Sequence, residues 1–154
     1  MCGGHAFNGA KPVTSTAPLS ILLVDDDDVA AEAVTRGLAK NSMHCPIAIA
    51  EDGSVALQVL RGTHPTTHIA KPYLVLLDLN MPRMNGFEFL RELRMDKQLR
   101  GTVVFVLTTS DSDAERARAY EENVAGYIVK SGVGPRLSGL ARFLTEYRSA
   151  VVLP

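Results

Sequence analysis

Five short apolar runs alternate along the chain with segments in which apolar residues recur every three or four positions. The runs cover residues 19–24, 46–50, 73–77, 103–107 and 125–129. They do not alternate polar and apolar residues, which is typical of strands that are buried on both faces. The pattern therefore predicts an α/β fold, in which five parallel strands form a sheet with helices on both sides.

The intervening segments predict five helices. They cover residues 29–40 and 54–60, a stretch that begins at residue 86, a charged stretch that ends at residue 122, and a last one that includes residues 137–144. Asp28 is the expected N-cap of the first helix, and Asp111 or Ser112 the expected N-cap of the fourth. Gly62 is expected to end the second helix.

Composition suits one globular domain. The chain has 154 residues, of which 46% are hydrophobic and 21% are charged. We expect residues 1–18, rich in small and polar residues, to form a flexible tail. Residues 19–148 then form the domain, and residues 149–154 form a short C-terminal tail. The net charge of -1 argues against a nucleic-acid partner, which requires a basic face.

Neither the cysteines nor the apolar segments indicate an extracellular or membrane protein. Cys2 and Cys45 are the only cysteines, and they lack the spacing of a zinc or disulfide motif. No apolar stretch is long enough to span a bilayer, and no secretory signal is recognisable. We therefore expect a cytoplasmic protein that has no membrane partner.

Side chains suited to chemistry follow four of the predicted strands. Asp25 and Asp26 follow the first strand, Asp78 the third, Thr108 the fourth and Lys130 the fifth. Each also has an ordinary explanation, because aspartates cap helices, threonine favours strands, and lysine is usually a solvated surface charge. Ligands of parallel α/β sheets bind beyond the carboxyl ends of the strands, so the joint position of these residues indicates a site.

Three neighbouring carboxylates repel one another, and solvent, a proton or a cation must relieve the repulsion. Oxygen ligands favour a hard divalent cation, which we expect to be Mg²⁺, with Mn²⁺ as a substitute. A carboxylate beside such a cation can attack a phosphoryl group, and this transfer requires mainly positioning and charge neutralisation. The Lys130 ammonium and the Thr108 hydroxyl are suited to assist the cation.

Four motifs, in this order, resemble the receiver domain of two-component response regulators. They are Val24-Asp25-Asp26, residues 76–86 (LLDLNMPRMNG), Leu107-Thr108-Thr109 and residues 126–130 (GYIVK). The resemblance spans residues 19–147 and implies a doubly wound sheet in the strand order 2-1-3-4-5 with five helices. It implies that Asp78 is the phosphoacceptor and that Lys130 pairs with Asp78 or its phosphate. It also implies that Mg²⁺ is bound by the side chains of Asp26 and Asp78, by the Asn80 backbone carbonyl, and by Asp25 through water. Thr108 and Tyr127 would be the switch residues.

The resemblance implies a signalling protein rather than a turnover enzyme, with a sensor histidine kinase as its partner. Asp27 and Asp28 have no role in the pattern, so we assign them to helix capping and to the favourable end of the helix dipole. The Lys130-Ser131 pair, the run at residues 108–110 and the tail at residues 147–154 are similar to response regulators paired with phytochrome kinases. This similarity favours a bacteriophytochrome as the kinase, while a generic single-domain receiver remains the alternative.

The chain departs from the family pattern at two positions. Ser131 stands where the family usually has a proline after a cis peptide bond. A cis peptide bond that precedes a residue other than proline costs on the order of 3 kcal/mol, so we predict that the Lys130–Ser131 bond is trans. Thr109 replaces the small residue that usually follows the switch threonine, and its branched side chain is expected to restrict access to the phosphoryl group.

The segment after the last predicted helix is too short for an effector domain, so we expect output through contacts with other proteins. Phe143 and Tyr147 lie on a second stripe of that helix, and Val151 and Leu153 belong to the uncharged tail. Exposed apolar groups of this kind often mark an interface, which predicts a homodimer through the last helix and tail. The alternative is a tail that folds back onto its own domain.

Three rival functions are each disfavoured by particular residues of the chain. A haloacid dehalogenase-like phosphatase requires an acid two positions after its nucleophile, where this chain has Asn80. A flavodoxin-like electron carrier requires a neutral phosphate loop after the first strand, where this chain has four aspartates. A receiver-like binding module that no longer accepts phosphate usually lacks a key residue, whereas here the key residues are all present.

Overall fold

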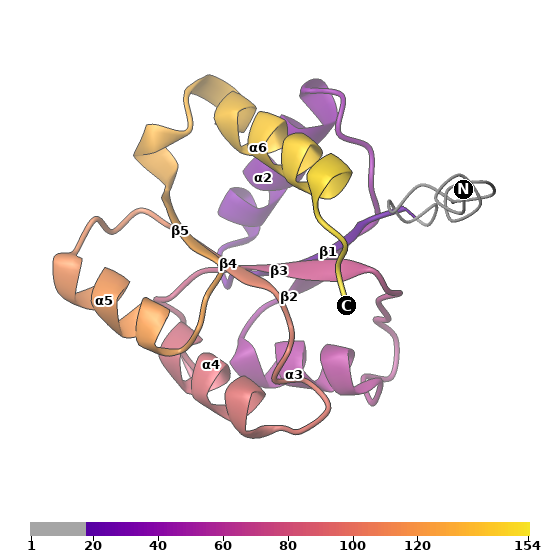
Figure 1. Ribbon diagram of the computed structural model, residues 1–154, viewed down its shortest axis with the longest axis vertical. Helices are drawn as coiled ribbons and strands as arrows, with labels where there is room; N and C mark the ends of the chain where they lie inside the picture. Colours follow the sequence, from indigo (N-terminus) through magenta and orange to yellow (C-terminus); the bar gives the residue numbers. More distant parts are fainter. Residues whose placement is uncertain (1–17) are drawn as a thin grey trace, which may run out of the picture.

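The computed structural model describes residues 18–154, and the tail predicted for residues 1–18 lies almost wholly outside this range. Five parallel strands form one sheet in the order β2-β1-β3-β4-β5, which confirms the predicted fold (Figure 1). The strands are β1 (Ser20–Val24), β2 (Ile47–Ala50), β3 (Tyr73–Leu77), β4 (Val104–Thr108) and β5 (Gly126–Val129).

Within residues 18–154, five α-helices cover the two faces of the sheet, as the alternating pattern predicts. In Figure 1, α2 (Asp28–Lys40) and α6 (Ser138–Ala150) lie on one side of the sheet. On the other side lie α3 (Gly53–Arg61), α4 (Gly86–Met95) and α5 (Asp113–Glu121). Parallel strands require such crossovers, and helices on both faces exclude water from the sheet.

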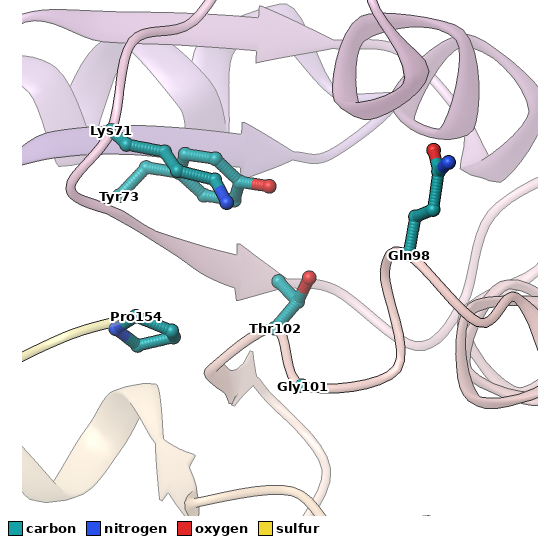
Figure 2. A pocket seen from close by; sticks show the side chains of 6 residues that line it. All are labelled: Lys71, Tyr73, Gln98, Gly101, Thr102 and Pro154. Carbon is teal, nitrogen blue, oxygen red and sulfur yellow. The ribbon is translucent and has the colours of Figure 1, made fainter.

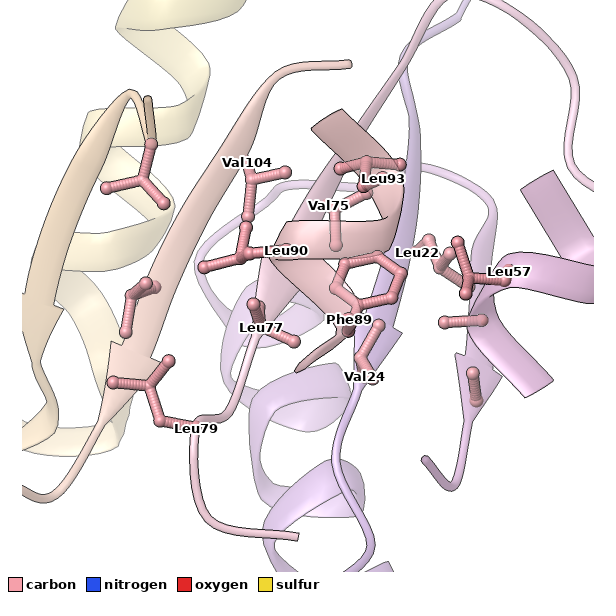
Figure 3. Packing of buried hydrophobic residues seen from close by; sticks show 14 of the residues in the cluster. Leu22, Val24, Leu57, Val75, Leu77, Leu79, Phe89, Leu90, Leu93 and Val104 are labelled. Atoms are coloured by element: carbon pink, nitrogen blue, oxygen red, sulfur yellow. The ribbon is translucent and has the colours of Figure 1, made fainter. Parts of the chain in front are cut away.

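The sheet separates two hydrophobic clusters, because successive side chains of a strand point to opposite faces. Leu22 and Val24 of β1 belong to the cluster under α3 and α4, where Phe89 packs in the centre (Figure 3). Ile21 and Leu23 belong to the other cluster, with residues of α2 and α6. The residues of β1 are at most 4% exposed, which explains why the strand is almost wholly apolar.

Local chemistry sets where the helices begin. Asp27, and not Asp28, is the N-cap of α2, because its carboxylate accepts hydrogen bonds from the Val29 and Ala30 amides at 2.9 and 3.3 Å. Asp28 is instead the first helical residue, where its charge favours the helix dipole. Ser112 caps α5 as predicted, by accepting a hydrogen bond from the Glu115 amide.

The segment between β5 and α6 contains two short 3₁₀ turns, η1 (Lys130–Gly132) and η2 (Pro135–Leu137). Within residues 18–154 the cis peptide bond is the one between Lys71 and Pro72. The Lys130–Ser131 bond is therefore trans, which confirms the prediction made from the missing proline.

The C-terminal tail folds back toward the amino end of the sheet. Helix α6 ends at Ala150, and Leu153 then packs against the cluster beneath α2 and α6. Figure 2 shows Pro154 beside a cavity of about 70 Å³ at this end of the molecule. The other residues that line the cavity are Lys71, Tyr73, Gln98, Gly101 and Thr102.

No helix in the described part of the chain is both long and apolar enough to cross a membrane.

Arg94 fastens the same end of the sheet. Its guanidinium donates hydrogen bonds of 2.7–2.9 Å to the backbone carbonyls of Arg100, Thr102, Glu122 and Asn123. These carbonyls precede β4 and β5, so one side chain of α4 holds two neighbouring strands in place. The site that the sequence predicts lies at the opposite end.

Candidate functional site

Three aspartates converge at the carboxyl end of the sheet. The parallel register pairs Val24 of β1 with Leu77 of β3, so Asp25 and Asp78 follow neighbouring strands at the same level. One carboxylate oxygen from each of Asp25, Asp26 and Asp78 lies within 4.8 Å of the other two. The structure thus brings together the three acids that the sequence singles out.

The three carboxylates differ in their exposure to solvent. Asp25 is buried, and its Oδ1 accepts a hydrogen bond from the Asp27 amide at 2.9 Å. Asp26 is exposed, and Asp78 is half-buried. Asp78 Oδ1 accepts a hydrogen bond from the Asn80 amide at 3.4 Å, which places the backbone of Asn80 beside the acids. Asp78 is therefore accessible from solvent, whereas Asp25 lies buried beside it.

Burial and neighbouring negative charge disfavour the ionised form of Asp78. Burial raises the pKa of Asp78, and the neighbouring charges of Asp25 and Asp26 raise it further. The Asn80 amide and the Lys130 ammonium act in the opposite direction. Because the charged form is disfavoured, a cation bound among these oxygens would lower the energy of the cluster. Three carboxylates are ligands that Mg²⁺ and Mn²⁺ accept, so the residues present fit such an ion.

Lys130 contributes the positive charge of the site. Its Nζ lies 3.6 Å from Asp25 Oδ2, whereas the family pattern predicts a pairing with Asp78 or its phosphate. Asp25 is the more buried of the two carboxylates, and a charge pair is stronger where water screens it less. Lys130 still acts on Asp78, because it lowers the pKa of that carboxyl.

The two predicted switch residues are linked through Ser110. Thr108 is fully buried, and its Oγ1 accepts a hydrogen bond from the Ser110 amide at 3.1 Å. The Tyr127 hydroxyl donates a hydrogen bond of 3.1 Å to the Ser110 carbonyl. The Ser110 hydroxyl in turn contacts Glu115, in the first turn of α5. Sequence reasoning missed Glu115, whose one signal is its place three residues after the Ser112 cap.

The residues predicted as dimer contacts divide into two groups. The rings of Phe143 and Tyr147 both meet Phe105 edge to face, with centroids 5.2 and 5.1 Å away. Tyr147 and Leu153 pack against their own core, which is what the fold-back alternative expects. Phe143 and Val151 remain 40% and 37% exposed. Of the four predicted contact residues, Phe143 and Val151 are therefore the ones that offer apolar surface to a partner.

Comparison with known proteins gives the family. The family model of the response regulator receiver domain matches residues 21–140. The probable methanogenesis regulatory protein FilR2 of Methanothrix harundinacea is 37% identical over 126 residues, which cover 82% of this chain and 81% of FilR2. The phosphorylated cyanobacterial phytochrome response regulator RcpA superposes with a TM-score of 0.78 and 30% identity, over 90% of this chain and 99% of RcpA.

The Mn²⁺-bound form of the response regulator Rcp1 superposes with a TM-score of 0.75 and 29% identity, over 90% of this chain and 99% of that structure. The range matched by the family model, residues 21–140, includes Asp25, Asp26 and Asp78 of the acidic cluster. The chain belongs to the response regulator receiver domain family, whose members signal through phosphorylation.

Proposed function

We propose that this protein accepts a phosphoryl group on Asp78 from a sensor histidine kinase. The observation that carries the proposal is the meeting of three carboxylates within 4.8 Å beside the ammonium of Lys130. Within this cluster Asp78 combines partial exposure with proximity to both acids. A phosphodonor can therefore approach Asp78. Asp26 is more exposed, but Asp78 is the acid within the motif at residues 76–86 that the family resemblance gives as the phosphoacceptor.

In the proposed reaction, an Asp78 carboxylate oxygen attacks the phosphorus atom of a phosphohistidine. A new oxygen–phosphorus bond forms while the phosphorus–nitrogen bond breaks, and the electron pair of that bond leaves with the imidazole. The Thr108 hydroxyl exchanges its contact with the Ser110 amide for one with the phosphoryl group. The Lys130 ammonium neutralises part of the added negative charge.

We propose Mg²⁺ as the resident cation, with Mn²⁺ as a substitute. Asp26 and Asp78 would hold it through their side chains, Asn80 through its backbone carbonyl, and Asp25 through water. The ion would supply charge neutralisation among the phosphoryl oxygens. Support comes from the acidic cluster and from the Mn²⁺-bound structure of the related Rcp1.

Intact-mass measurement after incubation with acetyl phosphate and Mg²⁺ tests this proposal. The native protein should gain the mass of one phosphoryl group, and Asp78→Asn should gain none. Asp28→Asn is the matched control, because Asp28 belongs to the same acidic run but lies on α2 outside the cluster. An undiminished mass gain in Asp78→Asn, or a gain that does not require a divalent cation, would contradict the proposal.

We also propose a bacteriophytochrome as the kinase, because the related RcpA is a phytochrome response regulator. Transfer from a purified, ³²P-labelled phytochrome kinase tests the pairing against an unrelated histidine kinase. Faster labelling by the phytochrome kinase is expected. Equal rates from both kinases would remove the preference.

For output we propose a homodimer that uses α6 and the tail. Support comes from Phe143, Val151 and Val152, which stay exposed although apolar. Replacing Val151 and Val152 by serine retains the Leu153 contact with the core and should weaken self-association, as should deletion of residues 151–154. Light scattering that finds monomers for the native protein and both variants would refute the dimer.

A further inference from the structure

Arg83 takes an unusual backbone conformation in the loop that follows Asp78. Its φ is +61°, in the left-handed region that favours glycine over residues with a side chain. Its guanidinium Nη2 lies 2.6 Å from Asp52 Oδ2 and 3.5 Å from Glu51 Oε1. Such strain persists only where the surroundings impose it, and the ion pair with Asp52 is one contact that holds Arg83 here.

Asp52 joins this loop to the start of α3. Its side chain is only 3% exposed, and its Oδ1 caps the helix by accepting a hydrogen bond from the Val55 amide at 2.9 Å. The other carboxylate oxygen is the one that holds Arg83. The buried Asp52 carboxylate therefore binds both the N-terminus of α3 and the loop. The Val55 amide or the Arg83 guanidinium alone would leave part of the carboxylate's charge uncompensated.

A second contact reinforces the first. The Gly53 amide donates a hydrogen bond of 3.1 Å to the Met84 carbonyl, next to Arg83. A Cβ atom at Gly53 would come within 2.9 Å of both Met84 and Phe89, so the loop lies directly on the start of α3. The loop thus rests on a helix that belongs to another crossover and has its own cap.

The other end of this loop lies at the acidic cluster. The Asn80 amide bonds Asp78 Oδ1, and the Gly86 amide donates a hydrogen bond of 3.0 Å to the Leu79 carbonyl, which closes the base of the loop. The base and the middle of residues 80–85 are therefore held by separate contacts. Displacement of Arg83 would pass along three peptide units to the carbonyl of Asn80.

We propose that Arg83 is a positioning residue: its ion pair with Asp52 holds residues 80–85 so that the Asn80 carbonyl is set for the divalent cation. This inference rests on the proposed function, because it concerns the cation of the same site. Arg83 does not touch the reacting atoms, and it acts through the loop that it fixes.

Charge alone predicts the opposite result, which makes the proposal easy to test. A guanidinium near an acidic cluster repels a cation, so its removal should tighten Mg²⁺ binding if the effect were purely Coulombic. Loss of positioning instead weakens binding. Partners that orient metal ligands typically contribute about 10- to 100-fold in affinity, and we expect about tenfold for this solvent-facing contact.

The experiment measures Mg²⁺ dissociation constants by isothermal titration calorimetry for the native protein, Arg83→Gly, Arg83→Lys, Asp52→Asn and the double variant Arg83→Gly/Asp52→Asn. Glycine relieves the left-handed strain but removes the ion pair. Asparagine at position 52 retains an oxygen that can cap α3. Arg91→Gln, an exposed arginine on α4, is the matched control for lost positive charge.

We expect Arg83→Gly and Asp52→Asn each to weaken Mg²⁺ binding about tenfold. The double variant should bind Mg²⁺ no more weakly than either single variant, because both changes break the same ion pair. Arg83→Lys should bind Mg²⁺ more tightly than Arg83→Gly, because lysine retains the positive charge. Thermal unfolding is followed in parallel, because an ion pair with a purely structural role changes the melting temperature and leaves the dissociation constant unchanged. Unchanged or tighter binding in Arg83→Gly overturns the proposal, as does an additive double variant. Failure of the native protein to bind Mg²⁺ would refute the proposed function itself.

Discussion

Replacing Asp78 by asparagine removes a charge that the fold disfavours. Burial, followed by the neighbouring Asp25, raises the pKa of Asp78 above its ordinary value of 3.8. The unfolded chain imposes no such penalty, so the charged carboxylate destabilises the folded state relative to the unfolded state. We expect Asp78→Asn to raise the free energy of unfolding at neutral pH when no divalent cation is present.

The magnitude follows from the spacing of the cluster. The oxygens lie within 4.8 Å of one another, and two unit charges at this upper limit repel by about 0.9 kcal/mol at the dielectric constant of water and by about 3.5 kcal/mol at an effective value of about 20. Asp78 is half-buried, and Lys130 offsets part of the repulsion. We therefore expect a gain of about 1–2 kcal/mol, which raises the melting temperature of a domain of this size by about 3–6 °C.

The pH dependence follows from the direction of the shift. Because the folded pKa of Asp78 is raised, the folded protein binds this proton more tightly than the unfolded chain does. Protonated Asp78 therefore contributes stability at low pH, and that contribution is lost as the pH rises from 3.8 through the folded pKa. The advantage of Asp78→Asn should be largest at neutral pH and should vanish as the pH falls below 3.8.

Urea unfolding followed by far-UV circular dichroism measures the difference, and suits a chain that has no tryptophan. Glu121→Gln, which changes an exposed acid on α5, is the matched control and should have little effect. Saturating Mg²⁺ should narrow the gap, because the cation stabilises the native cluster by mass action. An Asp78→Asn variant that is no more stable than the native protein at neutral pH in EDTA would refute the electrostatic argument.

Three further predictions concern single residues. Arg94→Met should lower the free energy of unfolding by about 3 kcal/mol, because four backbone carbonyls lose their donor, and urea unfolding measures the loss. Lys130→Met should tighten Mg²⁺ binding about fivefold, because about 1 kcal/mol of repulsion between the ammonium and the cation disappears. Calorimetry measures the affinity, and weaker binding by the variant would contradict the prediction. Thr109→Ala should speed phosphorylation by acetyl phosphate severalfold, because Thr109 is exposed next to the switch hydroxyl; equal rates by mass spectrometry would dismiss the steric argument.

The sheet and its acidic cluster could be predicted from the sequence because each depends on a regular feature. Strands buried on both faces leave unbroken apolar runs, and parallel strands present their carboxyl ends at one edge. Asp25 and Asp78 therefore had to lie close together once their strands were adjacent. The predicted N-cap of α2 was wrong by one residue. Four successive aspartates have the same side chain, so the sequence does not distinguish them, and the backbone conformation selects Asp27.

Contacts that depend on side chains far apart in the sequence could not be predicted. Arg83 and Asp52 belong to different crossovers, and nothing in their local sequences indicates that they meet. The pairing of Lys130 with Asp25 depends on relative burial, which a family pattern does not contain. The tail was ambiguous for another reason, because an apolar segment such as the one containing Leu153 can cover its own core or a partner's surface equally well.

Strand β5 is one of the two edge strands of the sheet and is half-buried along its whole length. Tyr127 on this strand bonds the Ser110 carbonyl, and the Ser110 amide bonds the Thr108 hydroxyl. A protein lying along this border is thus two hydrogen bonds away from a hydroxyl at the carboxyl end of β4. Under the proposed function, such a protein would sense phosphorylation of Asp78 without entering the acidic cluster.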